Sequence, residues 1–142
     1  MNLSKNVKIT RLAAYQGAAG SDYTSAAAVN MADYEGCLFI ASIGTAAANN
    51  GMKILQSSDN GSVDTFADLE GSKVLSDATQ TQFAIDIYRP QEQYLRPTII
   101  RGTSTTIESV WAIQYGPKKA PVTNTSTTLA AETHVSPDEG TA

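Results

Sequence analysis

Alternating apolar and polar side chains are clearest between residues 80 and 115. Phe83, Ile85 and Ile87 fall on one side of an extended chain, and small, acidic or hydroxyl-bearing residues fall between them. This period of two is typical of a strand with one buried face. Arg89-Pro90 closes the pattern, because proline has no N–H for a ladder and favours extended geometry in the residue before it. A strand that ends just before this dipeptide is therefore predicted.

Two further strands are predicted in the same stretch. The first covers residues 94–101 and contains Pro97, which indicates an edge strand or a bulge. After a short turn, the second places Ile107, Trp111 and Ile113 on one side. We expect this side to be buried, as in antiparallel sheets that turn one face toward a core. The opposite side takes the intervening residues Thr106, Glu108, Val110, Ala112 and Gln114.

The N-terminal half contains shorter strand patterns separated by turn residues. The run from Cys37 to Ile43 is continuously apolar and bounded by glycines, which fits a central sandwich strand. Asn50-Gly51 predicts a hairpin turn, and Ser58-Asp59-Asn60-Gly61 predicts a tight turn. The other predicted strands are residues 7–15, 23–31, 52–57 and 63–66, with loops at residues 16–21 and 68–77, the second containing a helical turn.

About eight strands separated by turns predict an all-β fold. No stretch alternates a strand with an amphipathic helix, which argues against a parallel α/β sheet. We expect residues 7–116 to form one body, an antiparallel two-sheet sandwich that is jelly-roll-like. The residues expected to be largely buried in its core are Phe39, Ile40, Ile54, Phe83, Ile85, Ile87, Ile107, Trp111 and Ile113.

Both ends of the chain differ from the body in composition. Residues 1–6 are polar and are predicted to be a flexible N-terminal lead-in. Residues 117–142, here the C-terminal arm, contain three prolines and no aromatic side chain, so they bury too little apolar surface to pack alone. We expect the arm to be extended or disordered when free and ordered by a partner. Its candidate partner-binding residues are Lys118, Lys119, Leu129 and Val135.

The composition excludes several classes of partner. Charged residues make up only 17% of the 142 residues and the net charge is −4, which argues against a nucleic-acid partner because such a partner requires clustered Lys and Arg. The single cysteine, Cys37, lies in an apolar run and is expected to be a small buried hydrophobe. No run of 18 apolar residues occurs, so no membrane partner is expected. We expect a soluble protein made in a reducing cytoplasm.

Catalytic and metal chemistry find little support in the sequence. The one histidine, His134, lies in the polar arm, where no positioned neighbour is expected to make it a general base. One cysteine and one histidine make a poor zinc site, and no glycine-rich phosphate-binding motif is present. Asp59, Asp64 and Asp68 could bind a cation, although their spacing does not match a calcium loop. No cofactor and no enzyme activity are expected.

Two carbohydrate-related alternatives depend on the predicted strands. Asp86 and Glu108 could form a cross-strand carboxylate pair of the kind that a glycosidase uses, although ordinary pairing with arginine or exposure to solvent is favoured. Trp111, Tyr115 and Tyr88 could stack on a sugar. Packing of Trp111 in the core is favoured over sugar binding, because Ile107 and Ile113 share its predicted side.

Four stretches share a pattern of strands and turns, namely DYEGCLFIASIG, ILQSSDNGSVDTFADLEG, AIDIYRPQEQYLRPTIIRG and AIQYGPKKAPVT. Their features are Gln-Ser-x-Asp-x-Gly after a strand, Tyr-Arg-Pro followed by Tyr-x-Arg, and Gln-Tyr-Gly before a basic segment with proline. In these features, from Asp33 to Thr123, the chain resembles the small head decoration, or cement, proteins of tailed bacteriophages, which are encoded near the major capsid protein. The features are structural, and none includes a catalytic residue.

The resemblance implies a virion structural protein. Such a protein would decorate and stabilise the outer surface of the capsid by bridging neighbouring major capsid protein subunits, after synthesis in the host cytoplasm. Its partners would be the major capsid protein and further copies of itself, usually as a homotrimer.

Two other classes of function stay open at this stage. A head–tail connector or tail component is also rich in β-structure and would form a ring with a lumen. A carbohydrate-binding β-sandwich would expose a planar aromatic patch and bind glycans as a free monomer.

Overall fold

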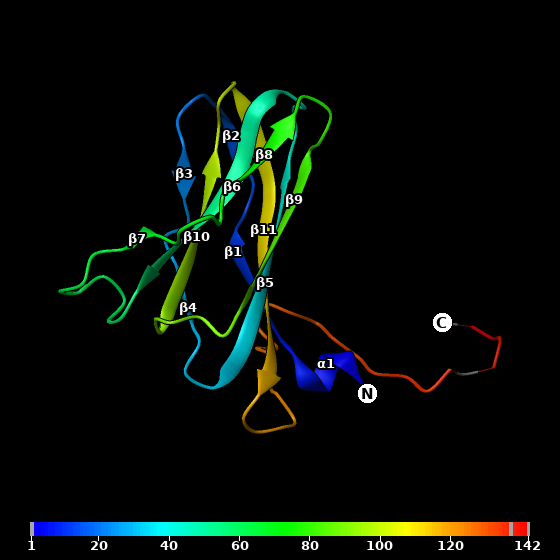
Figure 1. Cartoon of the computed structure of the whole chain (residues 1–142). Coiled ribbons are helices and arrows are strands. Elements are labelled where there is room, and N and C mark those ends of the chain that lie inside the picture. Colours follow the sequence, from blue (N-terminus) through cyan, green and yellow to red (C-terminus); the bar gives the residue numbers. More distant parts are fainter. Residues whose placement is uncertain (1, 137, 142) are drawn as a thin grey trace.

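Two ten-residue strands, β5 (Tyr34–Ile43) and β6 (Ala48–Ser57), each lie inside one sheet of a two-layer sandwich in the computed structural model, which describes residues 2–136 and 138–141 (Figure 1). Sheet A has the order β1-β11-β5-β9, and β2 also pairs with β11. Its strands are β1 (Lys8–Ala13), β2 (Gln16–Ala19), β5, β9 (Gln82–Tyr88) and β11 (Thr105–Pro117).

Sheet B packs against sheet A and has the order β3-β10-β6-β7, with β4 also paired to β10 and β8 to β6. Its strands are β3 (Tyr23–Thr24), β4 (Val29–Asn30), β6, β7 (Ala67–Asp68), β8 (Val74–Asp77) and β10 (Tyr94–Ile100). All pairings in both sheets are antiparallel. The predicted antiparallel two-sheet sandwich is therefore confirmed.

The core lies between the two sheets and is formed by every second residue of the long strands. Phe39, Ile54, Phe83 and Ile107 are buried in it, as predicted, and Ile85 and Ile87 pack against it with part of their surface exposed. Burial of such side chains stabilises the fold by about 1.5–3 kcal/mol each. The remaining fully buried apolar residues of the core include Cys37, Met52, Leu95, Ile99, Val110 and Ala112.

Strand β11 departs from the predicted arrangement of its two faces. Val110, Ala112 and Gln114 are buried toward the core, whereas Trp111 and Ile113 are only half-buried and lie on the other side. The register to β5 shifts between Ile107 and Ser109. This β-bulge adds one residue and exchanges the two faces beyond it, so the predicted core positions of Trp111 and Ile113 are wrong. The predicted core position of Ile40 is wrong as well, because Cys37, Phe39 and Ala41 are the residues of β5 that face the core.

The predicted hairpin turn at Asn50-Gly51 is also wrong, because both residues lie within β6. The Asn50 side chain is buried, donates to the Thr45 carbonyl at 3.2 Å and accepts from the Thr103 N–H at 3.0 Å. Gly51 lies so close to β8 that a Cβ atom there would be 2.1 Å from the Val74 carbonyl oxygen. Tertiary packing, rather than a turn, therefore explains this dipeptide.

Several smaller expectations also need correction. Residues 16–19, 67–68 and 74–77 are strands where loops or a helical turn were predicted, and residues 63–66 form no strand. Strand β10 is internal, not an edge strand, despite Pro97. The outer neighbours β3 and β4 are interrupted opposite Pro97, whose carbonyl accepts from the Ser25 N–H at 3.1 Å. The missing N–H of Pro97 therefore faces a gap in the sheet.

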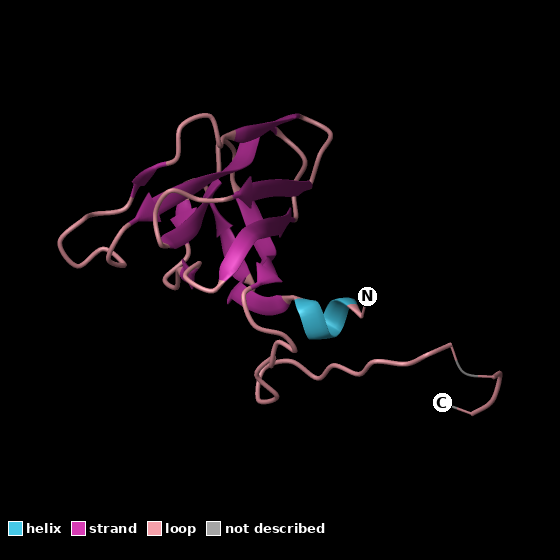
Figure 2. Cartoon of the chain, turned by 60° about the horizontal axis from the view of Figure 1, so that its bottom comes forward, coloured by secondary structure: helices cyan, strands magenta, loops and turns pink. Residues whose placement is uncertain are grey.

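The start of the chain and the beginning of the C-terminal arm lie together at one end of the sandwich (Figure 2). Residues 3–6, within the predicted lead-in, form the short helix α1 (Leu3–Asn6). The arm then runs beside it: the Val122 N–H donates to the Lys5 carbonyl at 2.8 Å, and Val122 is buried. Mobility of the lead-in and of the arm stays a prediction. Among the described residues, no helix is long and apolar enough to cross a membrane.

Candidate functional site

The outer face of sheet A, which points away from the core, carries rows of apolar side chains. Directly paired residues of antiparallel strands lie on the same face. One row therefore joins Ile9 of β1, Ile113 of β11 and Leu38 of β5. The next row joins Arg11, Trp111, Ile40 and Ala84. The apolar residues of this face are Ile9, Leu38, Ile40, Ala84, Tyr88, Trp111, Ile113 and Tyr115, and each is half-buried or exposed.

Arg11 limits this face along the β1 edge. Its guanidinium carbon lies 6.0 Å from the centre of the Trp111 ring, a distance at which a cation is attracted to the ring face. The Arg11 Nε donates to the Ala13 carbonyl at 3.3 Å. The indole therefore stays on the surface, held from the side by a charged neighbour rather than by the core.

Aromatic side chains continue the face at its other end. The Tyr115 ring lies over Gly36, because a Cβ atom at Gly36 would approach the Tyr115 ring atoms to 2.3 Å. The Tyr115 hydroxyl donates to Asp86 Oδ1 at 2.7 Å. Desolvation, followed by this hydrogen bond to Asp86, raises the pKa of Tyr115 to about 12. Tyr88 is 56% exposed and stacks with the Arg89 guanidinium at 5.1 Å.

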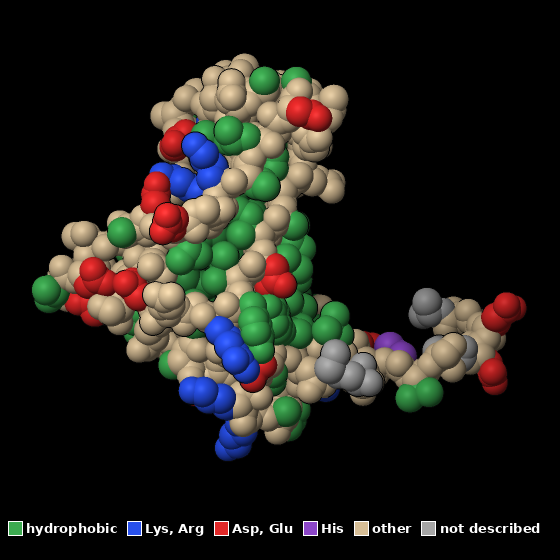
Figure 3. All heavy atoms as spheres, in the orientation of Figure 1, with side chains coloured by type: hydrophobic (Ala, Val, Ile, Leu, Met, Phe, Trp, Pro, Cys, Tyr) green, Lys and Arg blue, Asp and Glu red, His purple; other side chains and the backbone are tan. Residues whose placement is uncertain are grey.

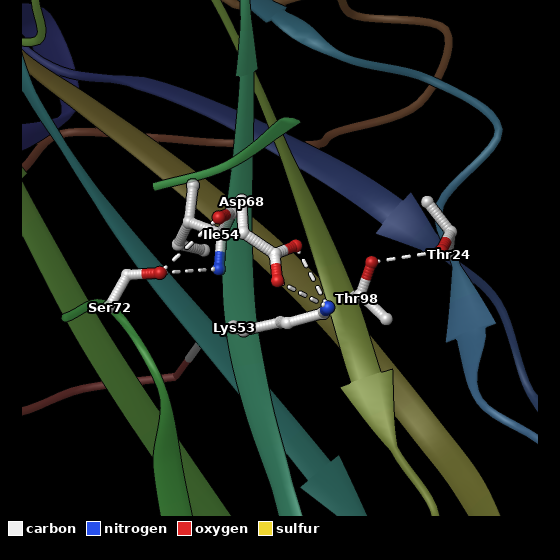
Figure 4. A network of polar contacts seen from close by, with 6 residues as sticks. All are labelled: Thr24, Lys53, Ile54, Asp68, Ser72 and Thr98. Atoms are coloured by element: carbon white, nitrogen blue, oxygen red, sulfur yellow. Dashed lines mark hydrogen bonds and ion pairs between the residues drawn. The ribbon is translucent and has the colours of Figure 1, made fainter. Parts of the chain in front are cut away.

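The outer face of sheet B differs from that of sheet A, because its polar groups bind one another (Figure 4). The Thr24 and Thr98 hydroxyls are hydrogen-bonded at 2.8 Å, and Lys53 pairs with Asp68 at 2.8 Å. Ser72 fastens the following loop to the backbone of Ile54 at 3.0 Å. The long strands of sheet B therefore carry polar groups of the kind found on a sheet that faces water, while Val74 and Leu75 of β8 are exposed apolar residues.

Apolar side chains form a band along the middle of the molecule in the space-filling view (Figure 3). Scattered apolar residues are ordinary on a protein surface, but a contiguous apolar patch commonly marks an interaction site. Aromatic residues and arginine are also the types enriched in the centres of protein interfaces. The outer face of sheet A is therefore the strongest candidate functional surface of the molecule.

The predicted partner-binding residues of the arm do not lie together. Lys118 is held by the chain itself, since its N–H donates to the Asp33 carbonyl at 2.9 Å and its Nζ donates to the Ala32 carbonyl. Lys119 is exposed. Leu129 is half-buried in a cavity that Ser4 and Val122 also line, and Val135 is 93% exposed.

The acidic residues considered for a cation are occupied by local contacts. Asp59 Oδ2 accepts the Val63 N–H at 2.7 Å and Asp59 Oδ1 accepts the Ser62 N–H at 3.0 Å. These hydrogen bonds, that from Val63 first, lower the pKa of Asp59. Asp64 accepts the Ser58 N–H at 2.7 Å. Within the described residues, no group of three or more His, Cys, Asp or Glu side chains could hold a metal ion.

The other candidate groups for chemistry are separate from one another. His134 contacts only Glu132, at 2.9 Å, and both side chains are exposed. Asp86 bonds to Tyr115, whereas Glu108 accepts from the Thr106 hydroxyl at 2.7 Å. Sequence reasoning missed the outer face of sheet A, because it placed Trp111 on the side of its strand that faces the core. One signal for that face was present, because Leu38 and Ile40 make β5 apolar on both sides.

Comparison with known proteins gives a single distant likeness to report. No protein-family model and no curated protein sequence matches the chain. A structure search found the crystal structure of the SPBc2 prophage-derived protein YomS, with 10% sequence identity and a TM-score of 0.49. The match covers 78% of this chain and 94% of that chain. No conclusion about function rests on this likeness.

Proposed function

We propose that the chain is a virion structural protein that decorates the outer surface of a tailed-phage capsid and bridges neighbouring major capsid protein subunits. The observation that carries the proposal is the contrast between the two sheets. Sheet A presents an apolar outer face with a tryptophan and two tyrosines on its long strands, whereas the long strands of sheet B carry polar groups that bind one another, and its exposed apolar residues, Val74 and Leu75, lie on the short strand β8. A protein with one apolar and one polar side is suited to lie on a larger surface.

The sequence resemblance supports the same proposal through the same residues. The stretches that resemble head decoration proteins contain Leu38 and Ile40 of β5, Tyr88 of β9, and Ile113 and Tyr115 of β11. The turn at Ser58-Asp59-Asn60-Gly61 belongs to them as well, and Asp59 closes it with backbone hydrogen bonds. The resemblance and the apolar face therefore coincide on sheet A.

We expect copies of the chain to associate with one another, as a homotrimer, on the capsid. The arm contributes to these contacts through Leu129 and Val135, whereas Lys118 is occupied by the carbonyls of the chain's own β4–β5 connection. Lys119 remains available to a carboxylate, a pair worth only about 0–1 kcal/mol at an exposed site.

The test is a count of copies per particle by quantitative mass spectrometry of purified virions. We expect the wild-type chain at a number comparable to the major capsid protein. Ile40→Lys, on the outer face of sheet A, should reduce the count roughly tenfold or more, the effect of losing ~1.4 kcal/mol of binding free energy. Thr24→Lys, on the outer face of sheet B, is the matched control and should leave the count unchanged.

Two results would contradict the proposal. A handful of copies confined to the tail vertex would favour the head–tail connector or tail component instead. An unchanged count for Ile40→Lys, with the variant shown to be folded by its thermal unfolding, would remove sheet A from the contact.

Carbohydrate binding is the second candidate, because Trp111, Tyr115 and Tyr88 share one face. The polar groups that a sugar needs are few there, with Asp86 bonded to Tyr115 and Arg11 beside Trp111. Specific retention of the free monomer on a glycan array, lost in Trp111→Ala, would establish this alternative.

A further inference from the structure

We infer that the free edge of β9 receives residues 129–135 of a second copy of this chain as an added antiparallel or parallel strand. The inference deepens the proposed function, on which it rests only for its setting on a capsid. It names the contact through which copies of the chain associate with one another.

Strand β9 is an open edge of sheet A. It is the last strand in the order β1-β11-β5-β9. The Ile43 N–H donates to the Thr81 carbonyl and the Arg89 N–H to the Glu35 carbonyl, so the odd-numbered residues between them face β5. The N–H and C=O groups of Ala84 and Asp86 therefore point outward, where no described residue pairs with them.

The opposite edge of the same sheet is partly covered by the chain itself. The Ile9 N–H of β1 donates to Asn124 Oδ1 at 2.8 Å, and Asn124 Nδ2 donates to the Val7 carbonyl at 3.2 Å. Exposed edges invite pairing, and proteins usually cover or block them. The arm therefore covers the start of the β1 edge, whereas β9 is unpaired along its length in the order of described strands.

The arm contains a segment with the pattern of a strand. Leu129, Ala131, Thr133 and Val135 alternate with Ala130, Glu132 and His134, which gives one apolar side and one polar side at a period of two. This segment lies in no strand, and Val135 is 93% exposed. Leu129, Ala131 and Thr133 line a cavity beside α1, where Thr133 is hydrogen-bonded to Ser4, so the segment exchanges these contacts for the partner's sheet edge. An extended peptide of this kind gains main-chain hydrogen bonds by adding to a sheet edge.

The side chains at the β9 edge suit the apolar side of that segment. Ile85 and Ile87 of β9 pack against the core but keep part of their surface exposed. An added strand would cover these residues with its own inward side chains, as successive strands of a sheet do. Its polar side would then lie beside Ala84 and Asp86 on the outer face.

The added segment and the edge that receives it are different surfaces of the chain, so the pairing is head-to-tail. The arm leaves the body beside β1 through Val122 and Asn124, and β9 lies at the other edge of the sheet, three strand spacings or about 14 Å away. A contact between two different surfaces of the same chain closes into a ring or continues as a filament. A closed ring of three would give the expected homotrimer.

The test cross-links two purified variants, each with one added cysteine, that are mixed without capsids. One carries Glu132→Cys in the arm and the other Ala84→Cys at the edge, and a short bis-maleimide joins them. Only pairing between chains can link the two variants, and Cys37 is fully buried. We expect the linked dimer at roughly tenfold or more over Glu132→Cys mixed with Ser62→Cys, because a bound arm holds the thiols at millimolar effective concentration. A yield equal to that control would overturn the inference.

A second measurement blocks the β9 edge that receives the added strand. Ala84→Pro deletes an N–H that points away from β5, so the β5–β9 ladder is kept while an added strand is blocked. We expect light scattering to show a monomer for this variant and an oligomer for the wild type. If Ala84→Pro unfolds, truncation after Asn124 provides the same test. It removes residues 129–135, the segment that would be added, and should give a monomer. An oligomer that survives the truncation would contradict the inference. It would not contradict the proposed attachment to capsids through Ile40, which the count of copies per particle measures separately.

Discussion

A substitution of Trp111 tests whether this residue belongs to the core of the fold or to its outer surface. The substitution Trp111→Thr removes the indole and keeps a β-branched residue that suits a strand. The structure gives Trp111 two local partners: Ile40 opposite it on β5, and Arg11 at 6.0 Å from its ring. Loss of these contacts should cost about 0.2–1 kcal/mol for the cross-strand pair and about 0.5–1 kcal/mol for the cation–π contact, or roughly 1–2 kcal/mol in total.

A core substitution sets the scale for comparison. Phe39 is 0% exposed, and Phe39→Ala should cost about 3–5 kcal/mol, the range for large aromatic side chains in cores. Urea unfolding of both variants measures the two free energies of unfolding, with equal m values as the check that the denatured states are alike. If Trp111→Thr cost as much as Phe39→Ala, Trp111 would belong to the core and the proposed surface would be wrong.

Three further predictions concern single residues. Gly51→Ala should destabilise the fold by about 1–3 kcal/mol, because its Cβ would meet the Val74 carbonyl at 2.1 Å, whereas Gly17→Ala, with no atom within 4 Å, should be nearly neutral in the same thermal unfolding assay. The pKa of Asp59 is lowered by hydrogen bonds to its carboxylate; stability from a lowered pKa is present above the unfolded value and lost as the pH falls, so the protection factor of the Val63 amide against exchange should decrease below about pH 4. Burial raises the pKa of the Cys37 thiol to about 12, so native protein should resist iodoacetamide at mildly alkaline pH, whereas unfolded protein should be alkylated; equal alkylation of both would refute the buried site.

The sequence predicted the fold class and several strands because their patterns are local. Strand β9 alternates strictly, so its inward residues Phe83, Ile85 and Ile87 followed from the period of two. The apolar run of β5 likewise indicated a strand inside the sandwich. Such patterns record which side of a strand faces the core, and they need no knowledge of its neighbours.

The part of the candidate surface that β11 contributes could not be predicted, because one bulge decides it. The extra residue near Ser109 exchanges the faces of β11, and no proline or glycine marks the position. The alternation alone therefore placed Trp111 in the core. The prediction of a hairpin turn at Asn50-Gly51 failed for a similar reason. The buried Asn50 side chain is hydrogen-bonded to the backbone of Thr45 and Thr103, and these contacts form no pattern in the sequence.

The contacts between the arm and the body also could not be predicted from the sequence. A single side chain, Asn124, satisfies backbone groups of residues more than a hundred positions away. Composition gave the segment too few apolar residues to pack, and Val122 is nevertheless buried against the start of the chain. One hydrogen-bonding side chain and one small apolar residue are enough for this contact, and neither forms a pattern.

A cryo-electron microscopy reconstruction of the decorated capsid tests the central claim most directly. The account predicts that the outer face of sheet A, with Ile40 and Trp111 at its centre, is covered by capsid protein or by a neighbouring copy. Sheet B, with Thr24 and Thr98, should face the solvent. A reconstruction in which sheet B contacts the capsid and the outer face of sheet A lies free in water would contradict the account.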